Sequence, residues 1–169
     1  MPLHPAVVHL PLGLAFVMPL IAIGFGLALW RGVVRPSAWL AVVGLQVVLL
    51  AGGIVALRTG QAEEERVEAA VSEAAIETHE EAAEAFLWLA GLTLVVLIPP
   101  VFSSRVMVTR AGVVAGTVMT LVVLGAALRA GHAGGTLVYV HGAGSVGVSS
   151  VPPGPQGGTA SDDDDRERR

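Results

Sequence analysis

Cysteine and lysine are both missing from this chain of 169 amino acids, and the absence of cysteine excludes several classes of site. Without cysteine, the chain has no disulfides, no iron–sulfur clusters and no zinc sites built on thiolates. Lysine is also absent, so all ten basic side chains are arginines. The formal net charge is only −4, and no basic stripe runs along any segment, so the sequence gives no sign of nucleic-acid binding.

Charged residues are scarce, and long apolar runs take their place. The chain is 53% hydrophobic and has a mean hydropathy of +0.70, which soluble domains of this size rarely reach. The runs cover about residues 10–30, 37–57, 86–102 and 111–128. Each is close to the ~20 residues that a helix needs to cross a bilayer core. The sequence therefore predicts an all-α membrane protein, with a bundle of four transmembrane helices within residues 1–142.

The placement of arginine predicts the orientation of this bundle. The link between the first two runs contains Arg31 and Arg35, and the link between the last two contains Arg105 and Arg110. Short basic links stay in the cytoplasm. The N-terminus does not look like a secretory signal, because no charged side chain precedes the first run. We therefore expect a multi-pass protein of the cytoplasmic membrane with its N- and C-termini on the extracytoplasmic side.

This topology brings every histidine of the chain to the same membrane face. The outer segments are the N-terminus, the connection between the second and third runs, and the C-terminus. Imidazole is the commonest ligand of metals and of haem iron, so the convergence is the main functional indication in the sequence. The five residues are His4, His9, His79, His132 and His141.

Residues 62–85 are rich in alanine and glutamate, which favours a helix. At ~100° per residue, His79 shares a narrow stripe with apolar residues, and the glutamates fall on the opposite face. We expect one long helix that projects from the membrane and continues as the third span, with His79 on its buried face. The alternative is a histidine that only packs at a helix interface. The stripe consists of Val71, Ala75, His79, Ala82 and Phe86.

The other histidines lie in two short segments. His4 and His9 are five residues apart, and so about 140° apart on a regular helix. Either His4 precedes the helix and folds back, or the two serve different purposes, or both are simply interfacial. His132 and His141 lie between glycines after the fourth run, and the alternating residues Thr136–His141 predict an extended segment that folds over the bundle as a lid.

Two further features have mainly structural interpretations. Gln46 lies near the middle of the second run, where an unpaired amide is costly, and we expect it to bond to another helix. A place beside a cofactor is the alternative. Residues 143–169 are rich in glycine, serine, proline and aspartate, which predicts a disordered tail.

Four motifs give the chain a resemblance to a known family. They are His4-Pro-Ala-Val-Val-His9-Leu-Pro11, Thr59-Gly60, His79, and Gly134-Gly135-Thr-Leu-Val-Tyr-Val-His141-Gly142, and they extend over roughly residues 3–143. On these motifs the chain resembles bacterial membrane proteins of domain of unknown function 2231. The resemblance implies four transmembrane helices in a bacterial membrane. Related modules beside cytochrome c-like domains imply redox work by analogy. This chain has no CxxCH motif for a covalent c-type haem.

The leading hypothesis is a noncovalent b-type haem near the outer face, used for electron transfer. Facing helices of a bundle can present axial imidazoles into a narrow slot. His9 and His79 are the favoured pair, and the arginines at the same depth would meet the haem propionates. The candidate cofactor-binding residues are His9, His79, His141, His4, His132, Arg58 and Arg129.

Two other hypotheses remain open. Zinc or copper could bind to His9, His79, His141 and His132, because several neutral imidazoles suit either ion. The chain could instead be a structural or assembly subunit of a larger membrane complex and bind no cofactor. An enzyme is the weakest interpretation, since no nucleophile–base pair stands out and no catalytic residue is predicted. The expected partners are the lipid bilayer and a redox partner or larger complex.

Overall fold

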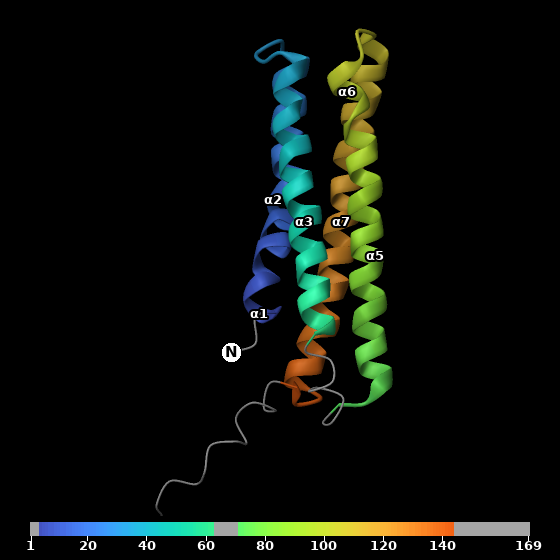
Figure 1. Ribbon diagram of the computed structural model, residues 1–169. Helices are drawn as coiled ribbons and strands as arrows, with labels where there is room; N and C mark the ends of the chain where they lie inside the picture. The colour runs from blue at the N-terminus through green and yellow to red at the C-terminus, as the bar shows by residue number, and fades with distance from the viewer. Residues whose placement is uncertain (1–3, 63–70, 144–169) are drawn as a thin grey trace, which may run out of the picture.

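The computed structural model describes residues 4–62 and 71–143, and every regular element within them is a helix. Figure 1 shows four long helices side by side, with the start of α1 and the end of α7 at the same end of the bundle. The predicted all-α four-helix bundle is therefore confirmed. The predicted tail lies, beyond residue 143, outside the described residues. The helices are α1 (His4–Val7), α2 (His9–Trp30), η1 (Pro36–Trp39), α3 (Leu40–Gln61), α5 (Glu73–Leu97), α6 (Pro99–Phe102) and α7 (Val106–Tyr139).

The surface of the bundle is apolar. Each of the four long helical segments is long and apolar enough to cross a membrane, and only 28% of the most apolar stretch of each is buried inside the molecule. Large side chains such as Leu20 and Trp88 are 71% and 80% exposed. Exposed apolar surface on this scale is stable in lipid rather than in water. The fold is that of a multi-pass membrane protein whose helices contact the bilayer.

Two of the helices extend beyond the apolar runs. The helix α5 starts at Glu73, and the predicted stripe faces inward, with Val71, Ala82 and Phe86 buried and His79 half-buried. This confirms the predicted extension of the third helix from Glu73 onward, while Val71 and Ser72 precede the helix and residues 63–70 lie outside the described residues. The helix α7 is longer still, with 34 residues, and reaches Tyr139. The two extensions pack along each other at the end of the bundle where α1 begins (Figure 1).

The predicted extended lid after the fourth span was wrong. Thr136–Tyr139 continue α7 as a helix, and the N–H groups of Val140 and His141 then donate to the Thr136 carbonyl at 2.9 and 3.2 Å. Leu137 is buried against Val71 and Ile76 beside the start of α5. This packing overrides the strand preference of the alternating residues, because β-propensity depends strongly on context.

Small residues allow the helices to approach closely. A Cβ atom on Gly53 of α3 would lie 2.6 Å from the Leu87 side chain of α5. A Cβ atom on Gly116 of α7 would lie 2.5 Å from the Leu97 side chain. Neither position can hold a larger residue without a shift of its neighbour. Close backbone approach of this kind is how helices associate in lipid.

Buried polar side chains link neighbouring helices. Gln46 of α3 is fully buried and donates from Nε2 to the Ala90 carbonyl of α5 at 2.9 Å, which confirms its predicted role as an interhelical link. The indole of Trp39 donates from Nε1 to the Leu97 carbonyl at 3.1 Å. That carbonyl lies at the last residue of α5, where the helix leaves its final acceptors without helical partners. The two bonds fix how α5 lies against η1 and α3.

Candidate metal centre

The five histidines gather at one end of the bundle, as the topology predicts. His4 begins α1, His9 begins α2, His79 is in the second turn of α5, and His132 and His141 lie near the end of α7 and just beyond it. In Figure 1 these segments all lie at the end where the chain starts. Two of the imidazoles meet: the ring centres of His4 and His79 are 6.4 Å apart, with an angle of 80° between the ring planes.

His4 is held by the end of α3. Its Nδ1 lies 2.8 Å from the Ala56 carbonyl oxygen and 3.4 Å from Thr59 Oγ1, and the Thr59 hydroxyl donates to the same carbonyl at 2.9 Å. A carbonyl oxygen only accepts, so Nδ1 carries the ring proton. In the neutral ring, Nε2 is then the nitrogen with the lone pair, the form in which a histidine binds a metal.

His79 is held by α7, but through Nε2 rather than Nδ1. Burial and the neighbouring His4 lower the pKa of His79 below its usual range, and a hydrogen bond to the Ala130 backbone opposes this by raising it. Because that bond favours the protonated form, the Ala130 group is the accepting carbonyl. His79 lies in the glutamate-rich part of α5, before the apolar run that begins at Phe86. Its Nδ1 is buried and has no hydrogen-bond partner among the described residues.

A glycine makes room for each ring. A Cβ atom on Gly60 would lie 3.1 Å from His4 Cε1, and one on Gly134 would lie 3.0 Å from His79 Cε1. On a helix, the side chain four residues after a carbonyl tilts back over that carbonyl. Gly60 follows Ala56 by four residues, and Gly134 follows Ala130 by four. Both glycines therefore leave the carbonyl beneath them open to an imidazole.

The centre thus consists of two matching half-sites, one from each helical hairpin. In the first, His4 lies on the backbone of α3, and in the second, His79 lies on the backbone of α7. The sequence motifs contained Thr59-Gly60 and Gly134-Gly135, but not the carbonyls of Ala56 and Ala130. The spacing Ala-x-x-x-Gly occurs at residues 56–60 and 130–134, but also at 22–26, 28–32, 127–131 and 143–147, so it does not single out these carbonyls.

The neighbour of His79 is His4, whereas the pair favoured from the sequence was His9 and His79. The physical reason is the rotation of ~140° between residues five apart, which turns His9 outward when His4 faces the bundle. His4 and His9 therefore have different surroundings, which agrees with the alternative that the two serve different purposes. Within residues 4–62 and 71–143, no group of three or more His, Asp or Glu side chains could hold a metal ion.

The remaining candidate residues surround the pair with exposed side chains. Arg58 and Arg129 lie within two residues of the half-site carbonyls, on α3 and α7 respectively. His9, His132 and His141 are exposed at the same end of the bundle. Comparison with known proteins adds no relative, since no family model, curated protein or solved structure matches this chain. The resemblance to proteins of domain of unknown function 2231 stays a prediction from the motifs.

Proposed function

We propose that this chain is an integral membrane protein that binds a b-type haem between His4 and His79 and serves in electron transfer. The observation that carries the proposal is the buried Nδ1 of His79, which has no hydrogen-bond partner among the described residues and belongs to a ring centred 6.4 Å from the ring of His4. A buried ring nitrogen without a partner is costly, and an iron ion would satisfy it.

The number of donors favours haem over a bare ion. A structural zinc site takes four protein ligands and a catalytic one takes three, whereas haem needs only two axial ligands from the protein. The described residues bring two imidazoles together and provide no group of three. Metal–nitrogen bonds of about 2.0–2.1 Å put the centres of two rings on opposite sides of one ion roughly 6 Å apart. The observed 6.4 Å is close to that value.

The residues of the chain would hold and tune this group. The carbonyls of Ala56 and Ala130 would fix the orientation of the two imidazoles as ligands. Arg58 and Arg129 are exposed near the half-sites in sequence and would be the candidates to meet the propionates. When bound, haem supplies a one-electron couple, and ligand type and burial set its potential. Membership in the family of domain of unknown function 2231 belongs to the same proposal.

A single zinc or copper ion is the second candidate, and one observation favours it. Gly60 and Gly134 bring the helix backbones so close to the two rings that added Cβ atoms would be 3.0–3.1 Å away. A bare ion needs far less space beside the imidazoles than a macrocycle, which this close packing would have to make room for. The second candidate therefore predicts metal binding without rearrangement of α1 and α5.

The visible spectrum of the purified protein tests both candidates. The protein is expressed with full haem supply, and spectra are recorded in the oxidised and reduced states together with elemental analysis. We expect a Soret band in the wild type and in His9→Ala, and its loss in His4→Ala and His79→Ala. Metal at a near-stoichiometric level without a Soret band would favour the candidate with a bare ion over the candidate with haem. If the protein shows neither a Soret band nor bound metal, it is a cofactor-free structural subunit, and the proposal is overturned.

We further propose that the histidine end faces the extracytoplasmic side of a bacterial cytoplasmic membrane. The chain contains no cysteine, so single cysteines can be introduced without background labelling. Thr78 and Ser104 are both exposed, on α5 near His79 and in the link before α7. A membrane-impermeant maleimide added to intact cells should label Thr78→Cys, and should label Ser104→Cys only after lysis. The reverse pattern would invert the topology.

A further inference from the structure

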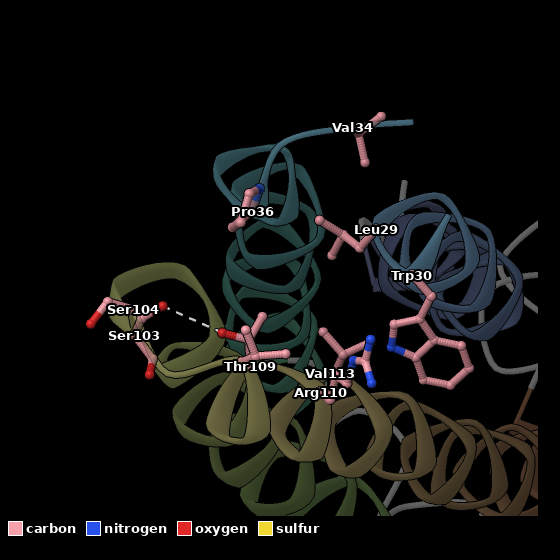
Figure 2. A pocket seen from close by; sticks show the side chains of 10 residues that line it. Leu29, Trp30, Val34, Pro36, Ser103, Ser104, Thr109, Arg110 and Val113 are labelled. Carbon is pink, nitrogen blue, oxygen red and sulfur yellow. Dashed lines mark hydrogen bonds between the residues drawn. The ribbon is translucent and has the colours of Figure 1, made fainter. Parts of the chain in front are cut away.

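The end of the bundle opposite the histidines contains a hollow that the metal centre does not use. Its volume is about 290 Å³, near the lower end of the ~300–1,000 Å³ range of small-molecule sites. Figure 2 shows side chains around it from the end of α2, the link to η1, the link after α6 and the start of α7. Leu29 and Val113 give it apolar walls, while Ser104 supplies a hydroxyl and Arg110 a positive charge. The hydroxyl of Thr109, which also lines it, donates to the Ser103 carbonyl at 3.3 Å.

A second hollow adjoins the first and has a different character. Its volume is about 310 Å³, and Ile21, Gly24, Phe25 and Ala28 line it along α2. Val34 lines both hollows, so they meet at this residue. One hollow thus offers a cation and a hydroxyl at the end of the bundle, and the other offers an apolar surface along a transmembrane helix. Together they match an amphiphile with an anionic head and a hydrocarbon chain.

The positive charge at this end of the bundle favours an amphiphile with an anionic head group. Four of the arginines in the described residues lie here, in the links that join α2 to η1 and α6 to α7 and near the start of α7. The acidic residues of the described ranges lie on α5 at the other end, between Glu73 and Glu84. The field at the hollow therefore favours an anion and disfavours the cationic group of a zwitterionic lipid. The four arginines are Arg31, Arg35, Arg105 and Arg110.

We propose that the two hollows bind one anionic phospholipid, with its phosphate at Arg110 and one acyl chain along Gly24 and Phe25. Basic pockets between transmembrane helices recognise anionic head groups by this combination of charge and apolar surface. The occupant is a bilayer component because the apolar hollow lies on a helix that crosses the membrane. This site is separate from the histidine pair, and its failure would leave the proposed haem site unaffected.

Native mass spectrometry of the purified full chain in neutral detergent tests the site. Phosphatidylglycerol and phosphatidylcholine with identical chains are added separately, and bound lipids are counted. We expect one phosphatidylglycerol to bind with clear preference over phosphatidylcholine. Arg110→Gln should weaken it about fivefold, while Arg129→Gln, an exposed arginine at the other end of α7, should not.

A second pair of variants tests the acyl-chain hollow. A Cβ atom on Gly24 or on Gly13 would have no described atom within 4 Å, so both positions of α2 accept a larger side chain. Gly24→Leu should fill the second hollow and weaken phosphatidylglycerol binding, and Gly13→Leu should leave it unchanged. Equal binding of the two lipids, or a preference that survives both Arg110→Gln and Gly24→Leu, would overturn the proposal. Displacement of the lipid by inorganic phosphate alone would show a site for the free anion and also overturn it.

Discussion

The two half-sites of the candidate metal centre share one backbone arrangement, here called a frame, but their histidines have different surroundings. Each ring bonds to the carbonyl of an alanine and packs over a glycine four residues later, on α3 for His4 and on α7 for His79. In the first frame, the Thr59 hydroxyl lies 3.4 Å from His4 Nδ1. The equivalent position of the second frame, one residue before Gly134, is Ala133.

The difference separates what the backbone does from what the side chains do. Helix backbones and glycines position both rings, so the frames are alike even though the residues around them are not. The burial of the ring then sets its proton affinity, and it lowers the pKa of His79 in particular. A neutral imidazole is the form that binds a metal. Desolvation thus favours the neutral ring in the second half-site, whereas the first holds its ring with a carbonyl and a nearby hydroxyl.

The largest expected effect comes from filling either glycine. Gly60→Leu or Gly134→Leu should push the imidazole off its carbonyl, reduce cofactor or metal content at least tenfold, and destabilise the protein by about 1–3 kcal/mol. Cofactor content per protein and unfolding in detergent measure the two effects. Gly44→Leu on α3 and Gly125→Leu on α7 are matched controls, because a Cβ atom there would have no described atom within 4 Å. A loss of cofactor or metal in only one of the two variants would show that the two frames are not equivalent.

A smaller effect concerns pH and distinguishes the two rings. In the cofactor-free protein the pKa of His79 is lowered, so the folded state favours the neutral ring more than the unfolded state does. Its contribution to stability is therefore complete above the unfolded pKa of ~6.5 and is lost as pH falls below it. The midpoint of thermal unfolding in detergent should drop between about pH 7.5 and about pH 5. His79→Gln should flatten this decline, and an unchanged decline would assign it to another group.

The sequence predicts the fold of this molecule better than the site within it. The apolar runs and the stripe that contains His79 predicted the helices, because lipid and burial act on whole faces of residues. The spacing of His4 and His9 predicted the rotation of ~140° between them, but not which of the two faces the bundle. The ring acceptors are carbonyls of Ala56 and Ala130, and every residue has a carbonyl. The helical state of Thr136–Tyr139 depended on burial of Leu137 against another helix.

The smallest effect tests the residue that distinguishes the frames. Thr59→Val removes the hydrogen bond of the Thr59 hydroxyl to the Ala56 carbonyl but leaves that of His4 Nδ1. It should cost about 0.5–1 kcal/mol of unfolding free energy. Ala133→Thr adds a hydroxyl to the second frame, and its gain should be offset by the lower helix propensity of threonine, for a net change within about 0.5 kcal/mol.

The informative readout of Ala133→Thr is the titration of His79 by NMR in detergent. If the frames are equivalent, the new hydroxyl lies beside the His79 ring as Thr59 lies beside His4, and it gives the buried ring a polar neighbour. The lowered pKa of His79 should then move back toward its usual range, because desolvation is its largest cause. An unmoved pKa would show that the shared spacing of alanine and glycine does not extend to the residue between them.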